Sequence, residues 1–235
     1  MTPDQLAFTA QRIAVLSASK ARMIRFGGIA LLISSLLMLG RSIFFIFIPA
    51  PPANGESVLN WVADAHFLLA MSNELLFFAI FAMLPASCAL FILFKEQNMT
   101  KAVLGCGIIL ISVPIVSLLN IIHGRLVYPI FGVLPSEESV RYSISVFYGG
   151  MHAVNLMYAI ALVILGSAMQ DQRWGTRYLA LSVIVAISEI AGAYPWIIGR
   201  LFDGITQVMY VFWLAIIGIK VFKLGYSPAD QQKSG

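Results

Sequence analysis

The chain has 235 residues, of which 60% are hydrophobic and only 11% are charged, and its mean hydropathy is +0.88. A soluble domain carries about a quarter charged residues because its surface must face water, so the composition excludes a soluble globular domain. It predicts an all-α membrane protein with several spanning helices. The net charge of +4 does not indicate a nucleic-acid partner, because the basic residues flank apolar runs in short loops.

The N-terminal segment predicts an amphipathic helix over residues 1–26. Thr2-Pro3-Asp4-Gln5 has the pattern of a helix start, with Pro3 at the first helical position. Apolar residues then recur at helical spacing, which favours a helix that lies on the cytoplasmic membrane surface and leads into the first span. The alternative interpretation is a frayed tail with helical tendency.

Six apolar runs follow, and each is long enough to span a membrane, since ~20 apolar residues cover the hydrocarbon core. The predicted spans are residues 27–48, 67–94, 102–123, 143–168, 178–199 and 204–222. They form a six-helix transmembrane domain over 27–223, and residues 224–235 form a cytoplasmic tail. Segment 49–57 contains three prolines and an Asn-Gly pair, and is predicted to be an external loop.

The distribution of charge predicts the orientation of these spans. The N-terminus, the loops 95–101 and 170–177 and the C-terminal tail together hold eleven of the fifteen Lys and Arg residues and four of the eleven acids, a net charge of +7. The other segments hold four basic and seven acidic residues, a net charge of −3. Because cytoplasmic loops carry the excess of Lys and Arg, both termini are predicted to be cytoplasmic.

Polar residues within the spans gather toward the predicted outer side. Counting ~1.5 Å per residue places Arg41 in the outer third of the membrane and Glu189 near its midplane. On the same scale Glu74 lies about 10 Å, and His152 about 13 Å, below the outer boundary. A charged side chain in hydrocarbon costs at least ~2.5 kcal/mol, so these groups should face one another or water.

Helical spacing predicts which of the polar residues share a face. Tyr148, His152 and Asn155 lie on one face of the fourth predicted span, and Asp203 and Gln207 lie on one face at the start of the sixth. We therefore predict a polar, aromatic-lined pocket that opens to the outer face and binds a small molecule or lipid. Its predicted ligand-binding residues are Arg41, Glu74, Asn120, Tyr148, His152, Asn155, Glu189, Gln207 and Tyr210.

Purely structural interpretations of the same residues exist. Arg41 with Glu74 or Glu189 would form a buried ion pair that fixes helix register. His152 with Asn155 would form hydrogen bonds that hold helices together. The one-sided distribution favours the pocket, because structural pairs have no reason to avoid the inner halves of the spans.

Three histidines, His66, His123 and His152, come from different spans or their outer ends. Three imidazoles and a water make a catalytic zinc site, and in this respect the chain resembles the seven-helix membrane hydrolases that include alkaline ceramidases and adiponectin receptors. The chain lacks their paired histidines in the last span, and His66 and His123 are interpreted as ordinary residues at headgroup level. We expect no metal and no cofactor.

Two other functions are carried as alternatives. The first is an intramembrane enzyme that acts on an amphiphile by acid–base or metal chemistry in the same pocket, with no catalytic residue assigned. The second is a structural or assembly subunit of the membrane. The expected partners are the lipid bilayer and a small-molecule or lipid ligand.

Three stretches of the chain carry a family resemblance. They are Ala21-Arg22, then Asn73-Glu74-Leu75-Leu76 through Leu90-Phe91-Ile92-Leu93-Phe94-Lys95, and Met151-His152 to Ala168. On these residues the pattern over 21–223 resembles the bacterial membrane family catalogued as domain of unknown function 4386. The resemblance implies a six-helix bacterial membrane protein, and with the charge distribution it places the chain in the bacterial cytoplasmic membrane. It implies no reaction, substrate or functional residue.

Overall fold

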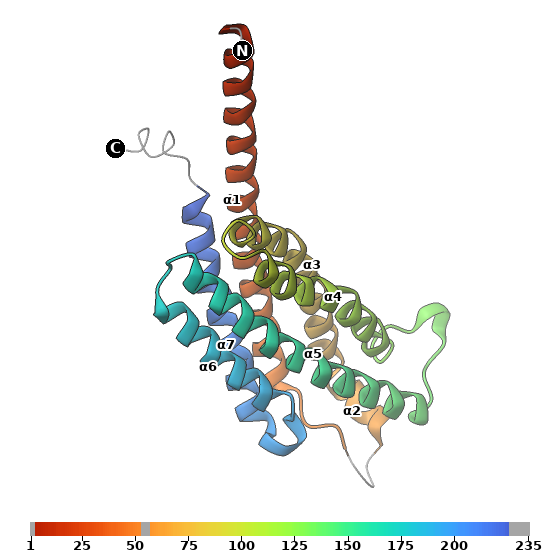
Figure 1. Ribbon diagram of the computed structural model, residues 1–235. Helices are drawn as coiled ribbons and strands as arrows, with labels where there is room; N and C mark the ends of the chain where they lie inside the picture. Colours follow the sequence, from red (N-terminus) through yellow and green to blue (C-terminus); the bar gives the residue numbers. More distant parts are fainter. Residues whose placement is uncertain (1–2, 53–56, 226–235) are drawn as a thin grey trace.

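The computed structural model describes residues 3–52 and 57–225, and it is helical without any strand in those ranges (Figure 1). The elements are α1 (Pro3–Phe47), α2 (Val58–Asp64), α3 (His66–Phe94), α4 (Met99–Gly124), the 3-10 turn η1 (Ile130–Gly132), α5 (Glu137–Asp171), α6 (Thr176–Gly192) and α7 (Pro195–Leu224). The predicted all-helical fold is confirmed.

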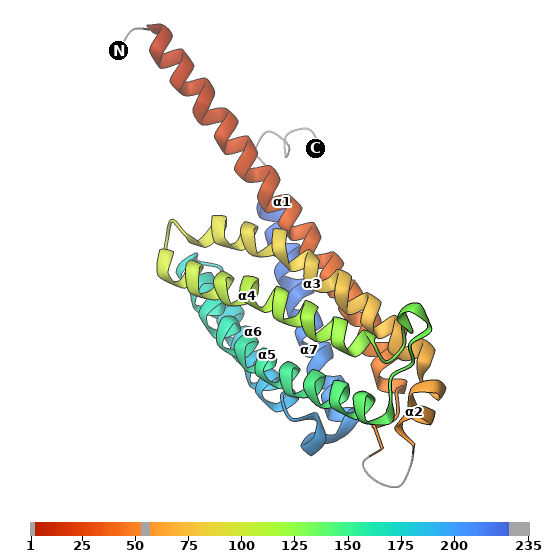
Figure 2. The same ribbon diagram turned by 90° about the vertical axis from the view of Figure 1, so that its right-hand side faces the viewer.

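The six long helices form a closed ring. Neighbours in the sequence pack side by side from α3 through α7, as short connections between antiparallel helices favour. Helix α1 packs against both α3 and α7 and thereby closes the ring (Figures 1 and 2). The short helix α2 contacts α3 and α5 at one end of the bundle.

Five helices are long and apolar enough to cross a membrane by length and composition. They are Ala18–Phe47 within α1, together with α3, α4, α5 and α7. Helix α6 has 17 residues and falls short of the ~20 that a perpendicular span needs. The described chain therefore has the character of a multi-pass membrane protein with five candidate spans.

The predicted boundary between the fifth and sixth spans is wrong. Helix α6 ends at Gly192 and not at residue 199, and α7 begins at Pro195. Proline disfavours the helical conformation at the residue before it, and Tyr194 accordingly adopts φ −122° and ψ 57°. Gly199, with φ 77°, makes a second break and separates the first turn of α7 from the long helix that follows.

The N-terminal helix is continuous with the first span. Helix α1 runs from Pro3 to Phe47 without the boundary predicted at residue 26, and its first part extends beyond the bundle (Figure 2). Its placement on a membrane surface stays a prediction. In the predicted tail over 224–235, residues from 226 onward lie outside the described part of the chain.

The two ends of the ring differ in chemistry. At one end, called the basic end, Lys20 pairs with Glu96 at 2.8 Å and Lys101 pairs with Asp171 at 2.7 Å. The hydrogen bond from Lys20 lowers the pKa of the exposed Glu96 carboxyl. The basic loops that were predicted to be cytoplasmic therefore gather at this end. The opposite end, called the cavity end, carries α2, η1 and the corner between α6 and α7 (Figure 1).

Close helix contacts occur in the part of the ring near the basic end. A Cβ added to Gly28 of α1 would lie 2.4 Å from the backbone nitrogen of Phe222 in α7. A Cβ on Gly166 of α5 would lie 2.6 Å from Cβ of Ser182 in α6. Small residues let the backbones of membrane helices approach closely, so these positions determine how closely the neighbouring helices of the ring pack.

Candidate functional site

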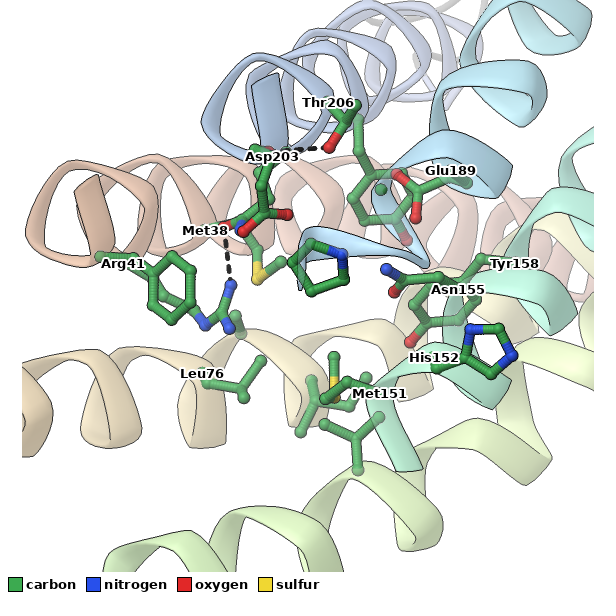
Figure 3. Close-up of a pocket in the computed structure, with 18 of the residues that line it drawn as sticks. Met38, Arg41, Leu76, Met151, His152, Asn155, Tyr158, Glu189, Asp203 and Thr206 are labelled. Carbon is green, nitrogen blue, oxygen red and sulfur yellow. Dashed lines mark hydrogen bonds between the residues drawn. The ribbon is translucent and has the colours of Figure 1, made fainter. Parts of the chain in front are cut away.

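A cavity of about 80 Å³, here called the inner cavity, lies inside the ring toward the cavity end. Seven of the nine predicted binding residues line it: Arg41, Tyr148, His152, Asn155, Glu189, Gln207 and Tyr210. They come from α1, α5, α6 and α7. Figure 3 shows Arg41 and Asp203 on one side of the space, with Asn155, Tyr158 and Glu189 on the other.

A larger hollow of about 560 Å³, here called the vestibule, adjoins the inner cavity. Four residues line both spaces: Phe45, Tyr148, Pro195 and Asp203. The vestibule is bordered by the segment after α1, the N-terminal part of α5 and the first turns of α7. Helix α7 contributes Trp196 and Arg200 to it. The unpredicted break at Pro195 thus lies where the two spaces adjoin.

Arg41 is buried and has few partners. Its Nη1 donates to Oε1 of Gln207 at 2.8 Å, and Nε2 of Gln207 donates to Oδ2 of Asp203 at 3.2 Å. None of the ion pairs between described residues involves Arg41, so the alternative interpretation, an ion pair with Glu74 or Glu189, is not found there. Because a guanidinium carries several N–H donors, most of this hydrogen-bonding capacity is unused within the described chain.

Glu189 is buried on the opposite side of the inner cavity. Its carboxyl makes no hydrogen bond or ion pair with any residue between 18 and 52 or between 57 and 225. Close to it, the rings of Tyr158 and Tyr210 stack with centroids 5.5 Å apart. The hydroxyls of Tyr158 and Ser112 lie 3.0 Å apart and form a hydrogen bond. The site thus places a buried carboxyl and phenol groups across the cavity from Arg41.

His152 is held in one orientation by the residue that follows α6. Its Nδ1 lies 2.8 Å from the carbonyl oxygen of Ala193, and since a carbonyl only accepts, Nδ1 carries the hydrogen. The other ring nitrogen, Nε2, is then an acceptor when the ring is neutral. The rings of Tyr194 and Trp196 lie 4.8 Å and 5.9 Å from the imidazole, so His152 belongs to an aromatic cluster at the corner between α6 and α7.

Glu74 does not line either space. It is exposed on α3 and accepts a hydrogen bond from the hydroxyl of Tyr128 at 2.9 Å. Burial and this hydrogen bond raise the pKa of Tyr128 to about 12. Leu76, two residues along α3, does line the inner cavity, and two residues turn a helix by about 200°. Glu74 therefore points away from the ring interior, and its depth in the membrane stays a prediction.

Asn120 does not line either space and belongs to a separate polar cluster. Its side-chain amide donates to the carbonyl oxygen of Asn73 at 3.0 Å, and Nδ1 of His123 lies 2.8 Å from Oδ1 of Asn73. Val116, one turn earlier on α4, lines the inner cavity. Asn120 therefore lies one turn beyond the cavity, where it joins α4 to α3.

The three histidines do not meet. His66 bonds the carbonyl oxygen of Val127, and His123 and His152 have the separate partners described above. Within the described ranges, no group of three or more His, Cys, Asp and Glu side chains is close enough to hold a metal ion.

Comparisons with protein-family models, with curated proteins and with solved structures found no significant match. The chemistry of the site is therefore inferred from its own residues. Arg41 and Asp203 lie on one side of it, and the carboxyl of Glu189, the amide of Asn155 and the phenol of Tyr158 lie on the other. The rest of the lining is mainly apolar and includes Met38, Leu76, Ile80, Met83, Val116, Phe147 and Met151.

Two ionisable residues of the cavity, Asp203 and Tyr158, were missing from the predicted set. Asp203 lies one turn before Gln207 on the same face of α7, and its spacing already connected it with that residue. Tyr158 lies three residues after Asn155 on α5, which is again one turn along the same face. Extending the polar face of α5 by one turn would have found Tyr158, whereas Asp203 was already on the predicted face and was left out of the binding set.

Proposed function

We propose that this chain is an integral membrane protein that binds a small amphiphilic molecule or a lipid in the inner cavity and vestibule. One observation carries the proposal: α1 and α6 bring Arg41 and Glu189, both buried, to one cavity with most of their hydrogen-bonding capacity unused. Burying an uncompensated charged group is costly, and such residues inside membrane helices mark binding sites or pathways. An amphiphile has polar atoms for these groups and carbon atoms for the apolar lining.

We further propose six membrane crossings with both termini in the cytoplasm. Helix α6 would cover about 26 Å at 1.5 Å per residue, close to the thickness of the hydrocarbon core. The basic end would face the cytoplasm because it gathers the basic loops. The cavity end would then face the outer leaflet of a bacterial cytoplasmic membrane, as the resemblance to domain of unknown function 4386 implies.

The distribution of polar groups supports binding from one side over transport. In the segments 27–38, 84–94, 102–112, 156–169, 178–188 and 208–219 there is no Asp, Glu, Lys, Arg or His. Three of these segments contribute Ser34, Met38, Tyr158 and Tyr210 to the inner cavity, and the segments run from there toward the basic end. A polar substrate would find no charged group there to accompany it across the membrane.

A cavity-filling variant tests the proposal. The protein is purified in a neutral detergent, and co-purified amphiphiles are extracted and quantified by mass spectrometry. Asn155→Phe fills the inner cavity, whereas Ile160→Phe changes an exposed position on the same helix. We expect a stoichiometric amphiphile with the wild type and with Ile160→Phe, and its loss from Asn155→Phe.

Three results would count against the proposal. Absence of any amphiphile from the wild type would contradict it, and so would equal retention by Asn155→Phe. A stoichiometric protein partner that is unaffected by both variants would favour an assembly subunit. If the protein converts the retained amphiphile chemically, the inner cavity is the active site of an intramembrane enzyme.

A further inference from the structure

Phe45 stands at the junction of the two spaces, with two arginines near its ring. The guanidinium of Arg41 lies 5.2 Å, and that of Arg200 lies 5.3 Å, from the ring centroid. Arg41 lines the inner cavity, Arg200 lines the vestibule, and Phe45 lines both. Cation–π contacts of this kind hold the two cations at the passage between the spaces.

Neither arginine has a carboxylate partner at ion-pair distance among the described residues. Arg41 donates to the neutral amide of Gln207, and Arg200 donates through Nη1 to the carbonyl oxygen of Phe45 at 3.1 Å. Asp203 is the one acid that lines both spaces, and it reaches Arg41 only through Gln207. Two cations thus share one anion that contacts neither directly.

This arrangement leaves the junction with more donors and more positive charge than its own residues satisfy. A guanidinium binds a carboxylate or a phosphate through paired hydrogen bonds, and these are the strongest contacts available to it. Among ligand chemistries, an anion at the junction would accept from Arg41 and Arg200 together. It would also offset the cost of holding both charges away from bulk water.

We propose that the junction at Phe45 binds the anionic head, a phosphate or a carboxylate, of an amphiphile. The proposal rests on the function proposed above and names the class of its ligand. The vestibule, at about 560 Å³ against about 80 Å³ for the inner cavity, has the room for the carbon chain. Its lining includes Pro51, Ile144 and Trp196, which present apolar surface to such a chain.

The test compares three probes that differ only in the parts that matter. Dioctanoyl phosphatidate carries two chains and a phosphate, dioctanoylglycerol carries the chains alone, and inorganic phosphate carries the anion alone. Each is titrated against the full-length protein in neutral detergent, and binding is read from the rise of the thermal midpoint. We expect dioctanoyl phosphatidate to bind about tenfold or more tightly than either of the others.

Matched substitutions connect this preference to the two arginines. Arg41→Gln and Arg200→Gln should each weaken the binding of dioctanoyl phosphatidate about tenfold and leave dioctanoylglycerol unchanged. Arg125→Gln is the control, because Arg125 follows α4 at the same end of the bundle and lines neither space. If Arg41→Gln does not fold, the half-buried Arg200 carries the test.

The outcomes separate this inference from the proposed function. Equal binding of both lipids, unaffected by the arginine substitutions but lost in Asn155→Phe, would overturn the anionic head and leave the amphiphile site intact. Inorganic phosphate that binds as tightly as dioctanoyl phosphatidate would support the anion site and identify a free anion as its ligand, against the amphiphile. Failure of every probe to bind the wild type would overturn both proposals.

Discussion

The same helices pack closely near the basic end and enclose hollows near the cavity end. Near the basic end, Gly28 lets α1 touch the backbone of Phe222, and Leu165 is fully buried against Gly105. Near the cavity end, the helices enclose two hollows and bury Arg41 and Glu189.

The two parts of the bundle therefore contribute differently to stability and to ligand binding. Close packing gains dispersion contacts and excludes polar groups, so the part near the basic end supplies most of the stability. Hollows and uncompensated charges reduce stability, and proteins tolerate them mainly at functional sites. Stability and ligand binding should therefore respond to substitutions in different parts of the ring.

The largest effect is expected from Gly28→Ala. The new Cβ would lie 2.4 Å from the backbone nitrogen of Phe222, which cannot move as a side chain can, so α1 and α7 must separate. We expect a loss of about 3 kcal/mol in the free energy of unfolding, measured by denaturant titration in detergent. Gly107→Ala is the control, because a Cβ there meets no atom within 4 Å. An equal effect of both variants would remove the packing argument.

Removal of apolar side chains should separate the two parts of the ring. Leu165→Ala opens a void in a fully buried position and should cost about 2 kcal/mol of unfolding free energy. Met151→Ala enlarges a cavity that already exists, and should cost less than half as much. The comparison is made by denaturant titration of both variants, and a larger loss for Met151→Ala would contradict the proposed difference between the two parts.

The two buried acids should differ although both line the inner cavity. Asp203→Asn removes the charge that offsets Arg41 and Arg200, and should cost about 2 kcal/mol. Glu189→Gln removes a buried carboxyl that has no partner among the described residues, so the free energy of unfolding should stay the same or rise. Thermal midpoints of both variants, measured without added ligand, check this order.

The smallest effect is expected at the surface of the basic end. The pKa of Glu96 is lowered from 4.5 by the hydrogen bond from Lys20, so the pair stabilises the folded protein above pH 4.5. This stabilisation is lost as the pH falls through the lowered pKa. Lys20→Met should therefore lower the thermal midpoint slightly at pH 7 and have no effect at strongly acidic pH. Arg22→Met, at an exposed position nearby, should show no such pH dependence.

The sequence predicted the all-helical fold and grouped most of the cavity residues, because both follow from counting along the chain. Apolar runs and a rise of ~1.5 Å per residue are local properties. On this basis seven predicted residues reach the inner cavity, including Arg41 and Glu189 from helices far apart in the sequence.

What counting could not supply was the rotation of each helix. Counting grouped Glu74 with the cavity residues, yet it faces away from the cavity because the phase of α3 is set by packing against α1 and α4. The early end of α6 was a different kind of error. Pro195 is visible in the sequence, and its effect on Tyr194 was outweighed by the apolar run that continues through it.

A cryo-electron microscopy map of the protein in a lipid nanodisc tests the central claim most directly. We predict elongated non-protein density that begins beside Arg41 and Arg200 and extends through the vestibule past Trp196. Side chains that collapse into the inner cavity, or density for water alone between Arg41 and Glu189, would contradict the account.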